Sequence, residues 1–243
     1  MITSDVREDP WLTGVLHRPV VAVDARDDVD VEALRHHAAE HPGALYYAKV
    51  PTANVPVVQA LVDLGFVPVD VAITLVRGTE PAQVRSPGGV VLTPAAPEHH
   101  DAVVDVAGAA FRWTRFHLDP GIADADADRI KREWVRNCLA GMRGIGVQVA
   151  LVDGVVAGFL ATLAARWQER ESRVIDLVAV HPEHQGRGVG GALVDAFIRE
   201  HGPAAEVLVV GTQAANIGSL ALYESRGFRV AQTQYVLHLH TAA

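Results

Sequence analysis

A glycine-rich turn between an apolar strand and a helix constrains the fold of this chain more than any other feature. Val174–Val180 is apolar and β-branched except for Asp176, which suits a buried strand, and His181-Pro182 ends it. The turn Gln185–Gly191 follows, and apolar residues then recur at helical spacing as far as Arg199. Such a turn offers free backbone N–H groups at the positive end of the helix dipole. We therefore expect it to bind a phosphate-bearing cofactor.

Two classes of cofactor compete for this turn. The dinucleotide fingerprint G-x-G-x-x-G is satisfied by Gly186, Gly188 and Gly191. That fingerprint should follow its strand directly and have an acidic residue at the end of the next strand. Here five residues separate the strand from the glycines, and the only acid of the next strand, Glu206–Gly211, lies at its start. The pattern Q/R-x-x-G-x-G/A, met by Gln185, Gly188 and Gly190, fits better.

Composition bounds the kind of protein. With 243 residues and 49% hydrophobic residues, the chain can bury a substantial core in one large domain or two small ones. A net charge of −8 argues against nucleic acid as a general partner. The single cysteine, Cys138, leaves no internal disulfide. The polar N-terminus and the lack of a long apolar run predict a cytoplasmic protein.

The order of predicted elements divides the chain into two parts. Strands at 19–25, 44–50 and 67–77 alternate with helices at 29–40 and 55–64, and the polar stretch Gly78–Gly89 reads as a linker. Residues 90–240 follow the order β-α-α-β-β-β-α-β-α-β. Together with the turn, this order resembles the GNAT (Gcn5-related) N-acetyltransferase superfamily.

That resemblance implies an α/β fold, a mixed central sheet flanked by helices, with acetyl-CoA as cofactor. It gives a catalytic domain over 90–243, a linker over 78–89 and a truncated GNAT-like half over 1–77. An internal repeat supports the last point, because Asn54 to Phe66 and Asn216 to Phe228 are equally long and each holds a helix between two strands. Coincidence is the alternative, since helix–Gly–Phe–strand is a common arrangement. The first copy lacks the glycine turn and has Leu61 in place of Tyr223, so it predicts no cofactor site of its own.

The cofactor site follows from the turn and from the resemblance. A bulge in the strand Leu177–Val180 would free backbone N–H groups to polarise a thioester carbonyl. Arg187 is a natural complement to phosphate. The predicted cofactor-binding residues are Leu177, Val178, Ala179, Val180, Gln185, Gly186, Arg187, Gly188, Val189, Gly190, Gly191, Asn216 and Tyr223.

Two residues are candidates for proton transfer. Asn216 and Tyr223 are seven residues apart, on one face of a helix, and Asn216 suits its N-cap. The resemblance implies that Tyr223 is the general acid for the leaving thiolate; a core aromatic is the alternative. Asp176 is either the base that accepts the amine proton or a satisfied buried carboxylate, and water can take the proton in place of a side chain.

Further motifs bear on the acceptor. They are L-V-D-L-G-F at Leu61–Phe66, A-A-F and T-R-F at Ala109–Phe111 and Thr114–Phe116, and G-T-Q at the start of Gly211–Gly227. With these motifs the chain resembles the TDP-fucosamine acetyltransferase branch, which implies a TDP-linked amino sugar as acceptor and a homodimer. Cations and aromatic rings in the loop 112–117 suit phosphate and a nucleotide base. The predicted substrate-binding residues are Arg112, Trp113, Arg115, Phe116, His117, Thr212 and Gln213.

Other functions stay open at this point. The loop 112–120 can be an ordinary surface loop, and the acids Asp119, Asp124, Asp126 and Asp128 keep a cationic aminoglycoside possible as acceptor. An amino acid, a protein N-terminus or a non-catalytic acyl-CoA-binding module are further alternatives. The sequence predicts no metal site.

Overall fold

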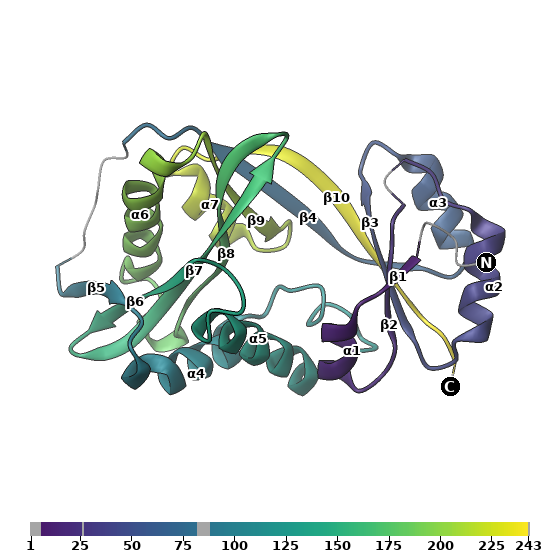
Figure 1. The fold of residues 1–243 in the computed structure, drawn as a ribbon, viewed down its shortest axis with the longest axis horizontal. Helices are drawn as coiled ribbons and strands as arrows, with labels where there is room; N and C mark the ends of the chain where they lie inside the picture. The colour runs from purple at the N-terminus through teal and green to yellow at the C-terminus, as the bar shows by residue number, and fades with distance from the viewer. Residues whose placement is uncertain (1–5, 26, 82–87, 243) are drawn as a thin grey trace.

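The ten strands of the described residues form one mixed sheet in the order β1-β2-β3-β10-β4-β9-β8-β7-β6-β5 (Figure 1). The computed structural model describes residues 6–25, 27–81 and 88–242. The strands are β1 (Val6–Glu8), β2 (Val20–Val23), β3 (Leu45–Pro51), β4 (Val67–Arg77), β5 (Val90–Pro94), β6 (Gly146–Val152), β7 (Val155–Trp167), β8 (Arg170–Val180), β9 (Val207–Gln213) and β10 (Arg229–His240). The α-helices are α1 (Pro10–Leu16), α2 (Val31–Glu40), α3 (Val55–Asp63), α4 (His100–Ala110), α5 (Asp124–Leu139), α6 (Val189–His201) and α7 (Ile217–Glu224). Short 3₁₀ turns lie at Pro97–His99, Pro182–His184 and Gly202–Ala204.

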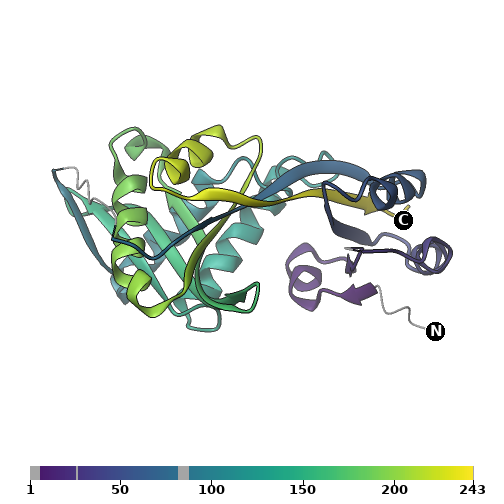
Figure 2. The ribbon, with the colours of Figure 1, turned by 90° about the horizontal axis from the view of Figure 1, so that it is seen from above.

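The strand order shows that the N-terminal half (residues 1–77) and the C-terminal half (90–243) exchange their last strands. The last strand of the N-terminal half, β4, lies between β10 and β9, while β10 lies between β3 and β4. Two views show β4 and β10 running side by side from one half to the other (Figures 1 and 2). The two halves therefore share one sheet, and their division into separate domains stays a prediction.

The pairing registers reproduce the internal repeat residue by residue. The sequence repeat has an offset of 162 residues, which relates Asn54 to Asn216. Ala72 on β4 pairs with Gln213 on β9, and the repeat-related Gln234 on β10 pairs with Pro51 on β3. Gln234 and Ala72 also pair with each other, so the two copies of the repeat are arranged symmetrically in the sheet on either side of this pair. A chance similarity of two helices would not require the strand pairings of the two halves to match. The matching pairings therefore favour a true repeat.

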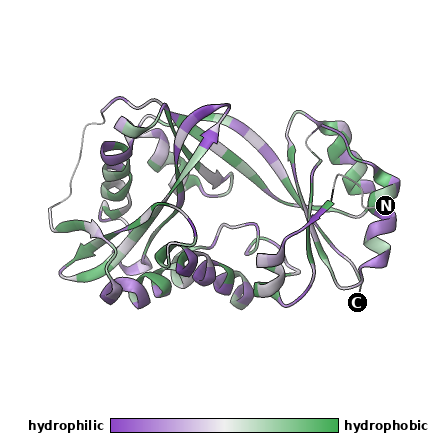
Figure 3. Cartoon of the chain, in the orientation of Figure 1, coloured by the Kyte–Doolittle hydropathy of each residue, from purple (hydrophilic) through white to green (hydrophobic). Residues whose placement is uncertain are grey.

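Helices cover both faces of the sheet. In the C-terminal half, α6 and α7 pack on one face around Leu193 and Phe197, and α4 and α5 pack on the other around Val103 and Val135. In the N-terminal half, α2 and α3 pack on one face, and α1 with the start of α5 covers the other. Hydrophilic and hydrophobic residues alternate along α4 and α5, as helices with one buried face require (Figure 3).

The predicted elements are present in the described ranges, with ends shifted by a few residues. The sequence interpretation missed β1 and α1, both short; α1 begins at Pro10 after the N-cap Asp9, whose side chain accepts from Leu12 N at 3.0 Å. Residues 82–87 of the predicted linker lie outside the described residues. No helix in those described ranges is long and apolar enough to cross a membrane.

Candidate active site

The site lies where two parallel strands separate. β8 and β9 pair from Ser172 with Val207 to Ile175 with Val210, and no further pair follows although both strands continue. The end of β8 is therefore paired to β7 on one side only. Its other edge presents backbone N–H and C=O groups that no neighbouring strand uses. A ligand with amide groups can bind along this edge as an added strand does.

A β-bulge at Asp176 produces this geometry. β7 pairs Ala161 with Leu177 and Thr162 with Ile175, so Asp176 is the extra residue on β8. Packing confirms that the bulge reverses the faces to which the side chains of β8 point. Residues two apart normally share a face, but Ile175 packs on the α6 side of the sheet and Leu177 on the α4 side. A bulge is thus present, one residue before the stretch Leu177–Val180 in which the sequence analysis considered it.

The glycine turn leaves its backbone donors free. Gly186 and Gly188 adopt φ values of 74° and 81°, which favour glycine, and Gly188 is the N-cap of α6. Within the described residues, none of the N–H groups of residues 186–191 donates to another backbone group, and the first to do so is Ala192 N, to Gly188 O at 3.0 Å. Gln185 Nε2 donates to Val180 O at 3.1 Å and fixes the turn to the end of β8. These free donors at a helix N-terminus suit a phosphate group.

The turn, the open edge and α7 enclose one cavity of about 480 Å³, which we call the glycine-turn cavity. Its size is in the range of small-molecule sites. The predicted residues that line it are Arg112, Trp113, Val178, Ala179, Val180, Gln185, Gly186, Gly188, Val189, Gly190, Gly191, Gln213 and Asn216. The sequence analysis did not assign His184, Ser219 and Leu222, which also line it. The buried Nδ1 of His184 has no hydrogen-bond partner among the described residues.

Helix α7 positions Asn216 and Tyr223. Asn216 is the N-cap, and its Oδ1 accepts from Ser219 N at 3.1 Å, as predicted. Tyr223 is 3% exposed, does not line the glycine-turn cavity, and packs edge-on against Phe228 at 6.0 Å between ring centroids. Burial raises the pKa of its hydroxyl well above the usual range. The structure therefore gives Tyr223 the surroundings of a core aromatic, in the cluster that includes Ile175 and Val210, the last pair before the strands separate.

The structure favours the second interpretation of Asp176, a satisfied buried carboxylate. Its oxygens accept from Nε and Nη2 of Arg143, both at 2.7 Å, and from Trp134 Nε1 at 2.9 Å. Cys138 Sγ also lies 3.8 Å away, and the carboxylate side chain is 6% exposed. With its oxygens bound in this way and no place in the cavity lining, Asp176 is not positioned as the catalytic base.

The loop 112–120 does not act as one binding surface. Arg112 and Trp113 line the glycine-turn cavity, and Trp113 is 49% exposed. Phe116 is a buried core residue. His117 is also buried, and its ring nitrogens contact Thr114 Oγ1 at 2.7 Å and Asp128 Oδ1 at 3.1 Å. Packing and internal hydrogen bonds thus use both side chains, so the structure does not favour the prediction that Phe116 and His117 bind substrate.

Four more predicted residues lie outside this cavity. Thr212 is buried within the sheet, where it pairs with Ile73, and Leu177 is buried against α4. Arg187 is exposed on the turn itself and does not line the cavity. Arg115 lies in a different cavity, between the two halves.

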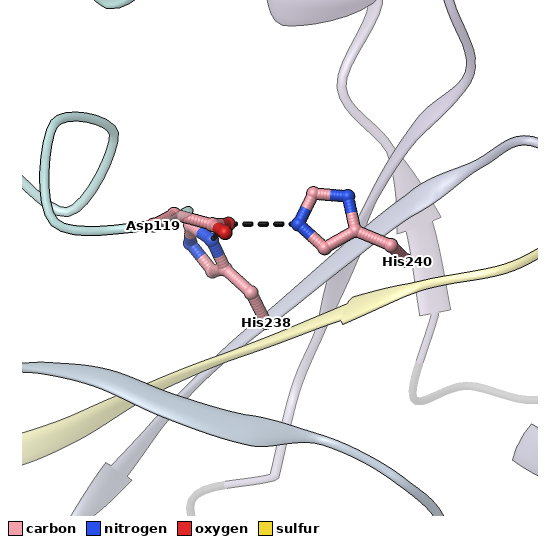
Figure 4. A group of neighbouring side chains, drawn as sticks. All are labelled: Asp119, His238 and His240. Atoms are coloured by element: carbon pink, nitrogen blue, oxygen red, sulfur yellow. Dashed lines mark hydrogen bonds and ion pairs between the residues drawn. The ribbon is translucent and has the colours of Figure 1, made fainter. Parts of the chain in front are cut away.

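A buried network holds the loop 112–122 against β10 (Figure 4). Asp119 Oδ2 lies 2.6 Å from His238 Nδ1 and 2.8 Å from His240 Nε2. The other ring nitrogens face arginines, His238 Nε2 at 3.2 Å from Arg115 and His240 Nδ1 at 3.2 Å from Arg18. Because arginine only donates, both imidazoles accept from it and donate their single proton to Asp119. The three groups could otherwise ligate a metal ion, but this proton arrangement is that of a hydrogen-bond network.

Comparison with known proteins places this site in a family. The model of the acetyltransferase (GNAT) family matches residues 110–228, which contain the glycine turn, the bulge and α7. The chain is 34% identical over 133 residues to the L-amino acid N-acyltransferase MnaT of Escherichia coli, covering 53% of this chain and 73% of MnaT. It is 29% identical over 158 residues to the spore coat polysaccharide biosynthesis protein SpsD of Bacillus subtilis, covering 64% of this chain and 52% of SpsD. The chain thus spans about half of SpsD.

A solved structure supports the fold of both halves. A tandem GNAT protein from the clavulanic acid biosynthesis pathway superposes with a TM-score of 0.60 at 15% identity, over 93% of this chain and 76% of that chain. At this identity the likeness shows the fold alone. It confirms the predicted mixed sheet flanked by helices. The match to the family model spans the diverging strands, the bulge and the glycine turn, and the chain belongs to the GNAT acetyltransferase family, which uses acetyl-CoA as its acyl donor.

Proposed function

We propose that this protein is an acetyl-CoA-dependent N-acetyltransferase that acts on the amine of a nucleotide-linked amino sugar. The observation that carries the first part is the glycine-turn cavity, which joins free N–H donors at the start of α6 to the open edge of β8. The second part is supported by the similarity to SpsD, a protein named for polysaccharide biosynthesis.

Each wall of the cavity has a distinct task. The N–H groups of Gly186–Gly191 bind the pyrophosphate of the cofactor, and Arg187 adds positive charge at the rim. The edge of β8 over Leu177–Val180 binds the pantetheine amides, and an N–H beside the bulge polarises the thioester carbonyl. Asn216, on α7, contacts the cofactor from the opposite wall. Acetyl-CoA supplies the acetyl group as a thioester.

Proton transfer completes the proposed chemistry. Tyr223 is the proposed donor of a proton to the leaving thiolate, as the family resemblance implies, although its side chain is buried outside the lining of the glycine-turn cavity. The amine loses its proton to water, because Asp176 is bound to Arg143 and Trp134. Tyr223→Phe tests this role: turnover should fall by about 10²–10⁴-fold, the range for general acid catalysis, with little change in acetyl-CoA affinity. A turnover within threefold of the unsubstituted protein would leave Tyr223 a core residue only.

The principal alternative is a small amine acceptor such as an amino acid, which the similarity to MnaT favours. The two are separated by incubating the protein with acetyl-CoA and either TDP-linked amino sugars or a panel of amino acids and aminoglycosides. Mass spectrometry should detect a gain of one acetyl group on the nucleotide sugar only. Acetylation of an amino acid alone would overturn the acceptor proposal, and acetyl-CoA binding without transfer to any amine would indicate a binding module.

The N-terminal half is proposed to be a second GNAT-like unit without a cofactor site. Its ladders match those of the C-terminal half, but its first copy of the repeat has no glycine turn. The cytoplasmic location and the homodimer stay predictions.

A further inference from the structure

A second cavity of about 640 Å³ lies between the halves, and we call it the inter-half cavity. The N-terminal half contributes Trp11 from α1 with Tyr47 and Lys49 from β3. The C-terminal half contributes Trp134 from α5 with Arg115 and Arg143. Figure 1 shows α5 reaching α1 at the junction of the halves. The shared sheet and the packing of α1 against α5 bring these residues together.

The walls of this cavity are positively charged. Lys49, Arg115 and Arg143 face it, and Asp9 is the one acid in its lining. Asp9 accepts from Tyr47 Oη at 2.9 Å and from Leu12 N, so its charge is engaged by neutral donors. Arg143 pairs with Asp176, but among the described residues no carboxylate lies within ion-pair distance of Lys49 or Arg115. Two cations thus line the cavity with no carboxylate in direct ion-pair contact among the described residues, although the charges of Asp9 and Asp119 act on Arg115 and that of Asp70 acts on Lys49.

Both lysines of the chain lie at or beside the inter-half cavity. The chain has nineteen arginines and only two lysines, Lys49 and Lys131. Lys131 is 8% exposed on α5, with its Nζ 4.7 Å from the ring of Trp134 and 4.9 Å from the ring of Phe111. Trp134 lines the inter-half cavity and Phe111 lines the glycine-turn cavity. Lys131 therefore lies between the two cavities, with one aromatic ring on each side.

Aromatic rings form much of the remaining lining, together with Leu12, Asn137 and Met142. The rings of Trp11 and Trp134 meet edge to face at 5.5 Å, and the guanidinium of Arg115 lies 3.9 Å from the ring centroid of Tyr47. Arg143 lies 4.8 Å from the ring centroid of Trp134. Flat rings beside unpaired cations suit a ligand that joins a planar base to phosphate groups.

We propose that the inter-half cavity binds the nucleoside diphosphate portion of the acceptor, with Lys49 and Arg115 holding the diphosphate. This inference rests on the proposed acetyltransferase function. The sugar amine then extends past Lys131 toward the glycine-turn cavity. The N-terminal half has no glycine turn of its own, and this role gives it a part in the reaction: it supplies one wall and one cation of the acceptor site.

The electrostatic state of the cations agrees with an anionic ligand. Burial lowers the pKa of Lys49 and the charge of Arg115 lowers it further, because Lys49 is surrounded by protein although solvent reaches it through the cavity. Burial, together with Arg115, Lys49 and Arg143, lowers the pKa of Lys131 to about 8, while Asp176 opposes the shift. Asp70 is a further acid on this side, and burial raises its pKa to about 6. A bound diphosphate would relieve the mutual repulsion of these cations.

The test is direct binding of TDP to the full chain, measured by calorimetry and by quenching of tryptophan fluorescence. Lys49→Gln should weaken TDP binding about tenfold and leave acetyl-CoA affinity unchanged. Arg199→Gln, an exposed cation at the end of α6, is the matched control and should change neither. Inorganic pyrophosphate should bind more weakly than TDP, since it lacks the base, and thymidine should bind more weakly still.

Three outcomes would overturn the inference. They are absence of TDP binding, unchanged TDP affinity in the Lys49→Gln protein, and competition between TDP and acetyl-CoA, which would place TDP in the glycine-turn cavity. Arg115→Lys, which keeps the charge where Arg115→Ala risks the fold, should retain most of the affinity. Failure of the proposed function itself is distinguishable, because it would appear as absent acetyl-CoA binding or as absent acetyl transfer to the nucleotide sugar, in measurements separate from TDP binding.

Discussion

The buried Asp119 offers a stability prediction whose size follows from its hydrogen bonds. Asp119 is 4% exposed and accepts three bonds, from His238, from His240 and from Gly121 N at 2.8 Å. Asp119→Asn keeps the shape but replaces one oxygen by an amide donor, so at least one buried donor loses its acceptor. Each bond to a charged group contributes roughly 1.5–3 kcal/mol, and the three share one carboxylate, so we expect a loss of about 2–4 kcal/mol in unfolding free energy.

The loss should depend on pH in a defined direction. Burial alone would raise the pKa of Asp119, but the hydrogen bonds from His238 and His240 outweigh it and hold the pKa well below its usual range. A depressed carboxyl pKa stabilises the fold above the unfolded pKa of about 4 and loses this effect as the pH falls further. Burial also lowers the pKa of His238, which adds acid sensitivity below about pH 6.5.

The assay is urea unfolding at pH 7 and pH 3.5, with thermal unfolding as a second measure. For a chain of this length, the loss corresponds to a fall in Tm of roughly 5–15 °C at pH 7, and the difference should shrink at pH 3.5. Asp105→Asn, an exposed carboxylate on α4, is the control and should shift Tm by less than 2 °C. A Tm for Asp119→Asn equal to that of the control would refute the reasoning. Stabilisation of the unsubstituted protein by Zn²⁺, reversed by EDTA, would refute the assignment of protons to the two histidines.

Three further changes test other parts of the molecule. Gly188→Val places a β-branched residue at φ 81° in the glycine-turn cavity, and calorimetry should show acetyl-CoA binding weakened at least tenfold. The control Gly43→Val, at φ 73° with open space around it, should lower stability by a similar amount and leave acetyl-CoA affinity unchanged. Asp176→Asn should lower the unfolding free energy by about 2–3 kcal/mol in urea while acetyl-CoA affinity stays within twofold, and unchanged stability with lost turnover would restore Asp176 as the base. The Asp70 pKa of about 6 lies above its unfolded value, so this carboxyl stabilises the fold at low pH and loses that effect as the pH rises through 6. Asp70→Asn should therefore stabilise the protein at pH 7 by about 1–2 kcal/mol. Equal stability curves for the two proteins from pH 4 to 8 would contradict this.

Local sequence signals predicted the elements and the position of the glycine turn well. The glycines of the turn act through the conformation of their own backbone, so Gly186, Gly188 and the start of α6 were visible in the sequence. The substrate loop was predicted less well, because cations and aromatic rings in one loop do not say which way each side chain points. Arg112 and Arg115 are three residues apart, yet they line different cavities. The partners of Asp176, such as Arg143, are distant in sequence and follow only from the packing of α5.

The exchange of β4 and β10 is the feature that the sequence could not predict, and the proposed acceptor site depends on it. A chain in which each half keeps its own last strand would have the same helices, turns and apolar patterns, because those signals are local. The difference lies in which long strands pair, and β4 and β10 pair antiparallel about Gln234 and Ala72, residues 162 positions apart. With this pairing, β3 lies beside β10, and the loop around Arg115 is fixed to β10 through His238. Lys49 and Arg115 therefore line the same cavity because β4 and β10 are exchanged between the halves. The same exchange joins the catalytic half to a half that has no glycine turn.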